Sequence, residues 1–134
     1  MGRVDDVINV AGHRLSTGEI EQVLPSHEDV VECAVIAVPD ELKGQLPVGL
    51  VVLKSGVDRG VDDVVAQLIA RVREDIGPIV CFRRCLVVAR LPKTRSGKIL
   101  RGMMSQIASG EQPPTPPTID DPETLVEVRA ALTS

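Results

Sequence analysis

Residues 92–101, with the sequence Pro-Lys-Thr-Arg-Ser-Gly-Lys-Ile-Leu-Arg, are the part of this chain best suited to chemistry. Gly97 permits a tight turn immediately before Lys98, which would present the lysine amine at the tip of a loop. The formal net charge of the whole chain is −4, so this cluster of cations stands out and is expected to bind an anion. The cations of the segment are Lys93, Arg95, Lys98 and Arg101.

The spacing excludes the commonest phosphate-binding loop. Walker A requires a glycine five positions before its Gly-Lys pair and a Ser or Thr after it, whereas Pro92 and Ile99 stand at those positions. Taken alone, the segment is more often a solvated basic turn between a strand and a helix. Further observations are therefore needed to choose between these two interpretations.

Composition indicates one globular domain with an aliphatic core. The chain has 134 residues, of which 43% are hydrophobic and 25% charged, and Phe82 is its one aromatic residue. Base stacking on aromatic side chains is therefore excluded as a binding mode. The 19 acids against 15 cations also argue against nucleic-acid binding, and residues 83–101, with seven cations and no acid, favour a small phosphate-bearing ligand.

The cysteines and histidines predict neither a disulfide framework nor a metal site. Cys33, Cys81 and Cys85 contain no Cys-x-x-Cys pair, and His13 and His27 lie far from them in sequence. We expect buried thiols and no bound metal. The chain has no apolar run of about 18 residues and no signal peptide near its beginning, so we expect no membrane partner and a cytoplasmic location.

The first elements that must position the basic segment are a hairpin and a helix. Residues 7–10 and 14–15 flank Ala-Gly-His, which predicts a short hairpin or a tight loop. Ser16 then suits the N-cap of a helix, with Glu19 completing a capping box. Leu15 before the cap can pack against Ile20, and the apolar stripe continues as far as a proline.

The rest of the chain alternates strands and helices. Runs rich in β-branched residues predict strands, and an apolar stripe at helical spacing predicts the best-defined helix. The connection over residues 40–45 could be a helical turn or a loop. The expected strands span residues 30–38, 48–53 and 85–89, and the expected helices span residues 62–76 and 99–108.

Residues 110–122 contain five prolines and predict an extended linker, which a terminal helix over residues 122–132 could follow. The alternation is compatible with an α/β or an α+β arrangement. We expect the α+β class, with a small, mainly three-stranded central sheet flanked by helices and preceded by a short N-terminal hairpin.

Two segments together carry a family resemblance. Residues 2–15, with the sequence Gly-Arg-Val-Asp-Asp-Val-Ile-Asn-Val-Ala-Gly-His-Arg-Leu, and residues 92–101 resemble signature motifs of acyl-CoA synthetases in the adenylate-forming superfamily. They stand in the order and separation of the C-terminal domain of that family. The match extends to about Gly110 and is most similar to the short-chain branch that makes acetyl-CoA or propionyl-CoA.

The resemblance implies a two-step reaction. ATP activates a short-chain carboxylate to an acyl-adenylate, and the C-terminal domain then rotates so that coenzyme A displaces AMP. By this resemblance Lys98 contacts the carboxylate and α-phosphate oxygens during adenylation. Asp5 matches the hinge, Arg3 a residue beside the ribose, and Arg14 a contact to the nucleotide phosphates.

The resemblance also assigns Gly12 to the pantetheine tunnel, Arg73 to a phosphate of coenzyme A, and Lys98 to reversible acetylation by an acetyltransferase and a deacetylase. Each residue has a simpler alternative role. Asp5 could be a turn residue, Gly12 a hairpin glycine, Arg73 a helix surface cation and Arg14 a charge at a strand edge.

Nothing in the sequence matches the Gly/Ser/Thr-rich phosphate loop or the acyl pocket of the family. We therefore expect residues 1–110 to be a mobile lid domain and residues 111–134 a Pro-rich tail. A separate N-terminal domain would hold ATP with Mg²⁺, and this chain alone would be inactive and bind no cofactor tightly. The alternative is a stand-alone, non-catalytic regulatory module that binds a nucleotide or another anion.

Overall fold

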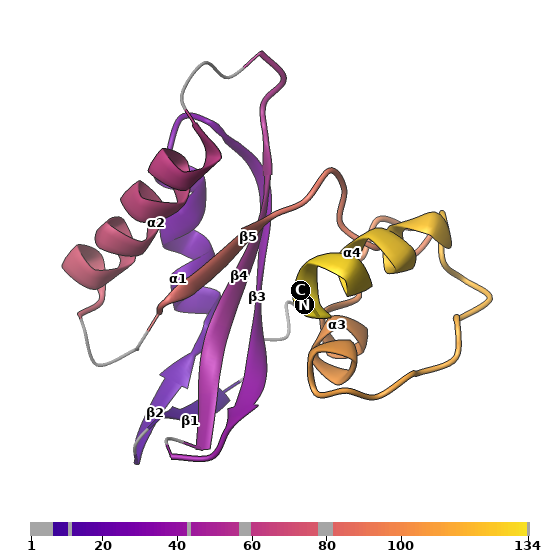
Figure 1. Cartoon of the computed structure of the whole chain (residues 1–134), viewed down its shortest axis with the longest axis horizontal. Helices are drawn as coiled ribbons and strands as arrows, with labels where there is room; N and C mark the ends of the chain where they lie inside the picture. Colours follow the sequence, from indigo (N-terminus) through magenta and orange to yellow (C-terminus); the bar gives the residue numbers. More distant parts are fainter. Residues whose placement is uncertain (1–6, 11, 43, 57–59, 78–81, 134) are drawn as a thin grey trace.

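A central sheet of mixed strand direction organises the molecule (Figure 1). The structure is a computed structural model, and it describes residues 7–10, 12–42, 44–56, 60–77 and 82–133. The two longest strands, β3 (Val30–Asp40) and β4 (Gly44–Leu53), pair antiparallel. Strand β5 (Arg84–Val87) pairs with β4 in parallel.

A short hairpin extends this sheet at one end. It consists of β1 (Val7–Val10) and β2 (His13–Ser16), which pair antiparallel with each other. Its connection to the main sheet is the pair Val10 and Gly44, at the start of β4. The expected α+β fold, with a mainly three-stranded sheet and an N-terminal hairpin, is therefore confirmed.

Two pairs of helices cover the two faces of the sheet (Figure 1). Alternate residues of β3 point to opposite faces, because successive side chains of a strand alternate. Val35 packs with α1 and α2, whereas Ala34 and Ile36 pack with α3 and α4. The helices are α1 (Thr17–Val23), α2 (Val61–Asp75), α3 (Arg101–Ala108) and α4 (Glu123–Thr133).

The first long hairpin of the sheet is longer than predicted. Strand β3 continues through Pro39, which pairs with Gln45, and Asp40 pairs with Gly44, so the connection left open over residues 40–45 belongs largely to the two strands. Glu41 and Leu42 lie in the turn between them. Asp40 accepts the N–H of Leu42 at 3.2 Å within this turn. The expected end of this strand at residue 38 was wrong, because β3 lies at the edge of the sheet, where the missing N–H of a proline is tolerated.

The boundaries of the helices and of β5 lie within two residues of those expected from the sequence. Ser16 caps α1 by accepting the N–H of Gly18 at 3.2 Å, and Leu15 packs against the cluster that contains Ile20. Pro25 does not end the helical stretch, because a short 3₁₀ turn, Leu24–Ser26, follows α1 directly. The helix α3 begins two residues later than expected, and strand β5 begins and ends one to two residues earlier.

The exposed edge of β3 is covered by polar side chains from two helices. The N–H of Val35 donates to Glu21 Oε2 at 2.8 Å, and Ser105 Oγ donates to the carbonyl of Ala37 at 2.5 Å. An uncovered strand edge would invite pairing with another chain. Helices α1 and α3 are thus fixed to the same edge from opposite faces of the sheet.

Candidate functional site

The basic segment forms a narrow hydrogen-bonded hairpin. Lys93 and Ile99 pair as an isolated antiparallel bridge, and the N–H of Leu100 donates to the carbonyl of Pro92 at 3.0 Å. Gly97 has a φ of +93°, a left-handed conformation that favours glycine. The predicted tight turn before Lys98 is confirmed.

The hydroxyls of the hairpin stabilise its turn. The N–H of Thr94 donates to the carbonyl of Lys98 at 2.9 Å, and Thr94 Oγ1 accepts the N–H of Lys98 at 3.2 Å. Thr94 Oγ1 also bonds Ser96 Oγ at 2.9 Å. The backbone of Lys98 is therefore fixed at two points, while its side chain is exposed and its ammonium has no partner within the described part of the chain.

Two of the four cations of the segment are not free to bind an anion. Lys93 pairs with Glu32 of β3. Arg101 forms a bidentate pair with Glu21 of α1, with Nε–Oε2 and Nη2–Oε1 distances of 2.7 and 2.6 Å. Lys98 and Arg95 therefore remain as the exposed cations of the hairpin.

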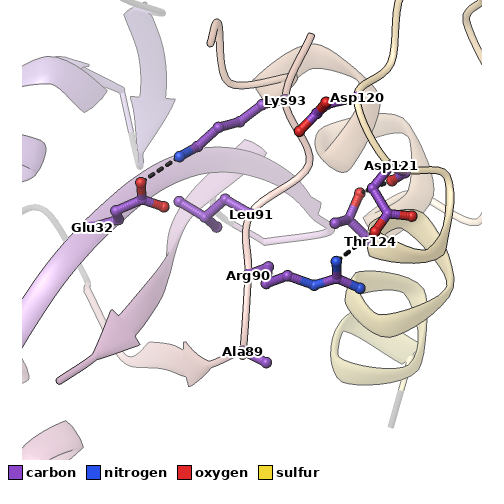
Figure 2. Close-up of a pocket in the computed structure, with 8 residues that line it drawn as sticks. All are labelled: Glu32, Ala89, Arg90, Leu91, Lys93, Asp120, Asp121 and Thr124. Atoms are coloured by element: carbon purple, nitrogen blue, oxygen red, sulfur yellow. Dashed lines mark hydrogen bonds and ion pairs between the residues drawn. The ribbon is translucent and has the colours of Figure 1, made fainter. Parts of the chain in front are cut away.

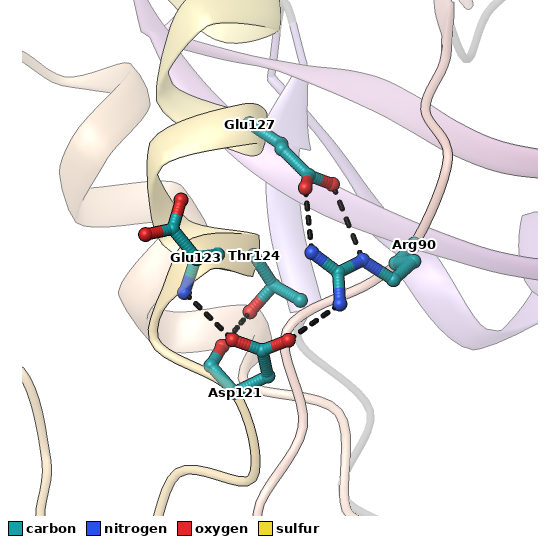
Figure 3. Close-up of polar contacts among 5 residues, drawn as sticks. All are labelled: Arg90, Asp121, Glu123, Thr124 and Glu127. Atoms are coloured by element: carbon teal, nitrogen blue, oxygen red, sulfur yellow. Dashed lines mark hydrogen bonds and ion pairs between the residues drawn. The ribbon is translucent and has the colours of Figure 1, made fainter.

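Arg90, just before the hairpin, is also paired within the chain (Figure 3). Its guanidinium donates to Asp121 at 2.5 Å and to both oxygens of Glu127, at 2.6 and 3.4 Å. The side-chain hydrogen bond from Arg90, followed by the backbone N–H of Glu123, lowers the pKa of Asp121 below its ordinary value. The acids that balance this cationic stretch come from distant parts of the sequence.

The other predicted site residues that the structure describes lie away from this hairpin, on the N-terminal hairpin and on α2. Gly12 is exposed and has a φ of +87°, a left-handed conformation that favours glycine, and an added Cβ would meet nothing within 4 Å in the described part of the chain. Arg14 is exposed on β2, opposite Asn9. Arg73 is exposed in the last turn of α2, on the opposite face of the sheet from α3. Arg3 and Asp5 lie outside the described residues.

A small polar cavity beside the hairpin includes residues that sequence reasoning missed. Its volume is about 230 Å³, and it lies between β3, the chain leaving β5 and the tail (Figure 2). Residues 110–122 are expected to be a linker, and the terminal helix expected over residues 122–132 is present as α4. Asp121 before Pro122 is a recognisable N-terminal signal of this helix. The cavity is lined by Glu32, Ala89, Arg90, Leu91, Lys93, Asp120, Asp121 and Thr124.

The described residues offer no metal site: no group of three or more His, Cys, Asp or Glu side chains is placed to hold an ion. Burial raises the pKa of the Cys33 thiol to about 11 and that of the Cys85 thiol to about 12. Both thiols are thus poorly reactive. Cys85 is buried as expected, Cys33 is only partly buried, and Cys81 lies outside the described residues. In the described ranges, no helix is long and apolar enough to cross a membrane.

The sequence and the fold of the chain are similar to those of known proteins. Residues 19–98 match the family described as AMP-binding enzyme C-terminal domain. The chain is 58% identical over 132 residues to the uncharacterized protein PA3568 of Pseudomonas aeruginosa, covering 98% of this chain and 21% of that protein. It is 55% identical over 128 residues to acyl-CoA synthetase short-chain family member B, mitochondrial, of Dictyostelium discoideum, covering 96% and 19% respectively.

The crystal structure of an acyl-CoA synthetase from Brucella canis matches with a TM-score of 0.71 and 34% sequence identity, over 79% of this chain and 19% of that one. The chain therefore spans about a fifth of the length of these relatives. From the family match, the relatives and the shared fold, the chain belongs to the family of AMP-binding enzyme C-terminal domains.

Proposed function

We propose that this chain is the mobile C-terminal domain of an AMP-forming, short-chain acyl-CoA synthetase and that Lys98 is its adenylation lysine. The observation that carries this proposal is the exposed ammonium of Lys98 on a hairpin where Lys93 and Arg101 are already paired with acids. The match to the family of AMP-binding enzyme C-terminal domains supports the same reaction class, as does the similarity to relatives named acyl-CoA synthetases.

The proposed chemistry needs a positive charge at this position. A carboxylate oxygen attacks the α-phosphorus of ATP, the new P–O bond forms, and the bond to pyrophosphate breaks. Two anions must approach each other, and charge develops on the α-phosphate oxygens in the transition state. An exposed ammonium on a four-carbon stem can contact both groups and stabilise that charge, provided that its backbone is held in place.

The remaining parts of the reaction would come from a separate N-terminal domain. That domain would hold the carboxylate and ATP with its Mg²⁺, and the described residues of this chain form no cluster suited to the metal. Rotation about Asp5 would then bring Gly12 and Arg73 to coenzyme A, while Arg3 and Arg14 would contact the nucleotide. In this proposal the chain alone makes no acyl-CoA.

The test uses the complete synthetase with Lys98→Ala, and with Lys54→Ala as an exposed lysine control after β4. Adenylation is followed as pyrophosphate formation, and thioesterification is followed from supplied acyl-adenylate. Loss of one well-placed charge contact predicts a fall in adenylation of about 10²-fold or more in Lys98→Ala. Equal adenylation rates in both variants would refute the role of Lys98.

Three narrower points extend the proposal. Assays of the complete enzyme with acetate, propionate and butyrate would identify the acyl chain, which we propose to be short.

Lys98 is exposed and could accept an acetyl group, which would remove its charge. Mass spectrometry of protein from several growth conditions would detect this modification. A cytoplasmic location is likewise proposed, and cell fractionation would test it.

A further inference from the structure

We infer that residues 118–121, which Arg90 holds in place, position Lys98 for the reaction. These four residues are called the tail brace. The inference rests on the proposed role of Lys98 in adenylation. It assigns a part in the reaction to residues 118–121, which lie in the stretch that the sequence predicts to be a linker.

The tail brace pairs through its backbone with the hairpin over residues 92–100 that carries Lys98, which is called the lysine hairpin. Ile119 forms an antiparallel bridge with Thr94. The N–H of Arg95 donates to the carbonyl of Thr118 at 2.9 Å, and the N–H of Asp120 donates to the carbonyl of Lys93 at 2.9 Å. The first arm of the hairpin therefore has the Lys98 arm on one side and the tail on the other, as a small three-stranded unit.

This third strand is anchored in the core. Ile119 is 5% exposed and belongs to the cluster that contains Met104 of α3 and Leu125 of α4. A two-stranded hairpin is marginally stable by itself, whereas a third strand with an apolar contact gives it independent stability. The position of the Lys98 backbone thus depends on a segment that is about twenty residues further along the chain.

Arg90 fixes the other end of the tail brace. It is three residues before Lys93 and binds Asp121 and Glu127 (Figure 3). Asp121 in turn accepts the N–H of Glu123 at 3.0 Å through its carboxylate, as a helix-capping residue does. The Arg90 guanidinium therefore links the segment between β5 and the lysine hairpin to the beginning of α4.

The expected consequence is catalytic. Adenylation requires the Lys98 ammonium at a defined point, and a displacement of about 1 Å can lower a rate by about 10²-fold. Thioesterification from supplied acyl-adenylate does not use Lys98 in the proposed mechanism. Weakening the tail brace should therefore lower the first half-reaction selectively, whereas a purely structural role would lower both.

The experiment compares Asp120→Pro with Thr115→Pro in the complete synthetase. The first removes the N–H that bonds Lys93, and the second places a proline in the exposed part of the same tail. A second pair is Arg90→Ala against Arg83→Ala, which removes an exposed arginine from the other end of β5. Each variant is assayed for both half-reactions and for amide hydrogen exchange in residues 93–99.

The inference predicts faster exchange in residues 93–99 and at least tenfold slower adenylation in Asp120→Pro and Arg90→Ala, with thioesterification within twofold of the parent. Unchanged exchange would show that the tail does not brace the hairpin. Faster exchange with unchanged adenylation would overturn the positioning role, as would an equal loss of both half-reactions. Lys98→Ala is assayed alongside: if it adenylates normally, the proposed function fails, and the exchange data still report on the brace.

Discussion

Arg101 and Glu21 form a bidentate ion pair across a sequence separation of 80 residues, with N–O distances of 2.7 and 2.6 Å. The Glu21 side chain is 10% exposed and that of Arg101 is 24% exposed. One oxygen of Glu21 also accepts the N–H of Val35 at the edge of β3. This carboxylate thus joins α1, the edge of the sheet and the beginning of α3, directly after the lysine hairpin.

Glu21→Ala is expected to destabilise the protein by about 2 kcal/mol, because it removes the carboxylate that pairs with the partly buried Arg101 guanidinium and accepts the strand N–H of Val35. Urea unfolding followed by circular dichroism measures the change. Glu19→Ala, an exposed acid of the same helix, is the matched control and should cost well under 1 kcal/mol. Similar unfolding midpoints for the two variants would contradict this account of Glu21.

Gly49→Ala should destabilise the core by about 1–3 kcal/mol through overpacking. A Cβ at Gly49 would lie 2.8 Å from Cζ of Phe82, whose side chain is buried. The control is Gly102→Ala in α3, where nothing lies within 4 Å and where alanine favours the helix. Thermal unfolding of the two variants should shift in opposite directions, and a neutral Gly49→Ala would show that Phe82 repacks freely.

The contact of Asp121 with Arg90 predicts a dependence of stability on acid. The pKa of Asp121 is lower in the folded chain than its ordinary value of 3.8, so its contribution is fully present above that value and disappears as the pH falls through the folded pKa. The difference in urea midpoint between the parent and Asp121→Asn should therefore be constant above about pH 5 and shrink below pH 4. A difference that persists undiminished at pH 2 would rule out the ionised carboxylate as its source.

Burial of Cys33 and Cys85 predicts slow alkylation of the folded protein. Their pKa values of about 11 and about 12, against an ordinary 9.0, lower the thiolate fraction at pH 8 by about 100-fold and 1,000-fold. Iodoacetamide labelling with peptide mapping resolves each cysteine, and a urea-unfolded sample gives the reference rate. Labelling of Cys85 at the unfolded rate would mean that β5 opens readily.

The sequence predicts the elements of this fold better than the contacts among them. Periodicity located α2 to within a residue, the β-branched run located most of β3, and the apolar run located the part of β4 from residue 48 onward, because each pattern reflects local geometry. The turn at Gly97 was equally local. The continuation of β3 through Pro39 depended on its position at the sheet edge, which composition does not reveal.

The candidate site was predicted in part. The exposure of Lys98 follows from its place in a glycine turn, but the pairing of Arg101 with Glu21 and of Lys93 with Glu32 joins residues that only the tertiary fold brings together. The backbone hydrogen bond from Asp120 to Lys93 likewise depends on the tertiary fold. A count of cations along the chain therefore overstated the charge that a ligand could meet.

The most direct test of the central claim is the ratio of the two half-reaction rates in the complete synthetase with Lys98→Ala, each measured in a single turnover. The account predicts that pyrophosphate formation falls by about 10²-fold or more while acyl transfer from supplied acyl-adenylate to coenzyme A stays within twofold of the parent. Parental pyrophosphate formation, or an equal fall in both rates, would contradict it.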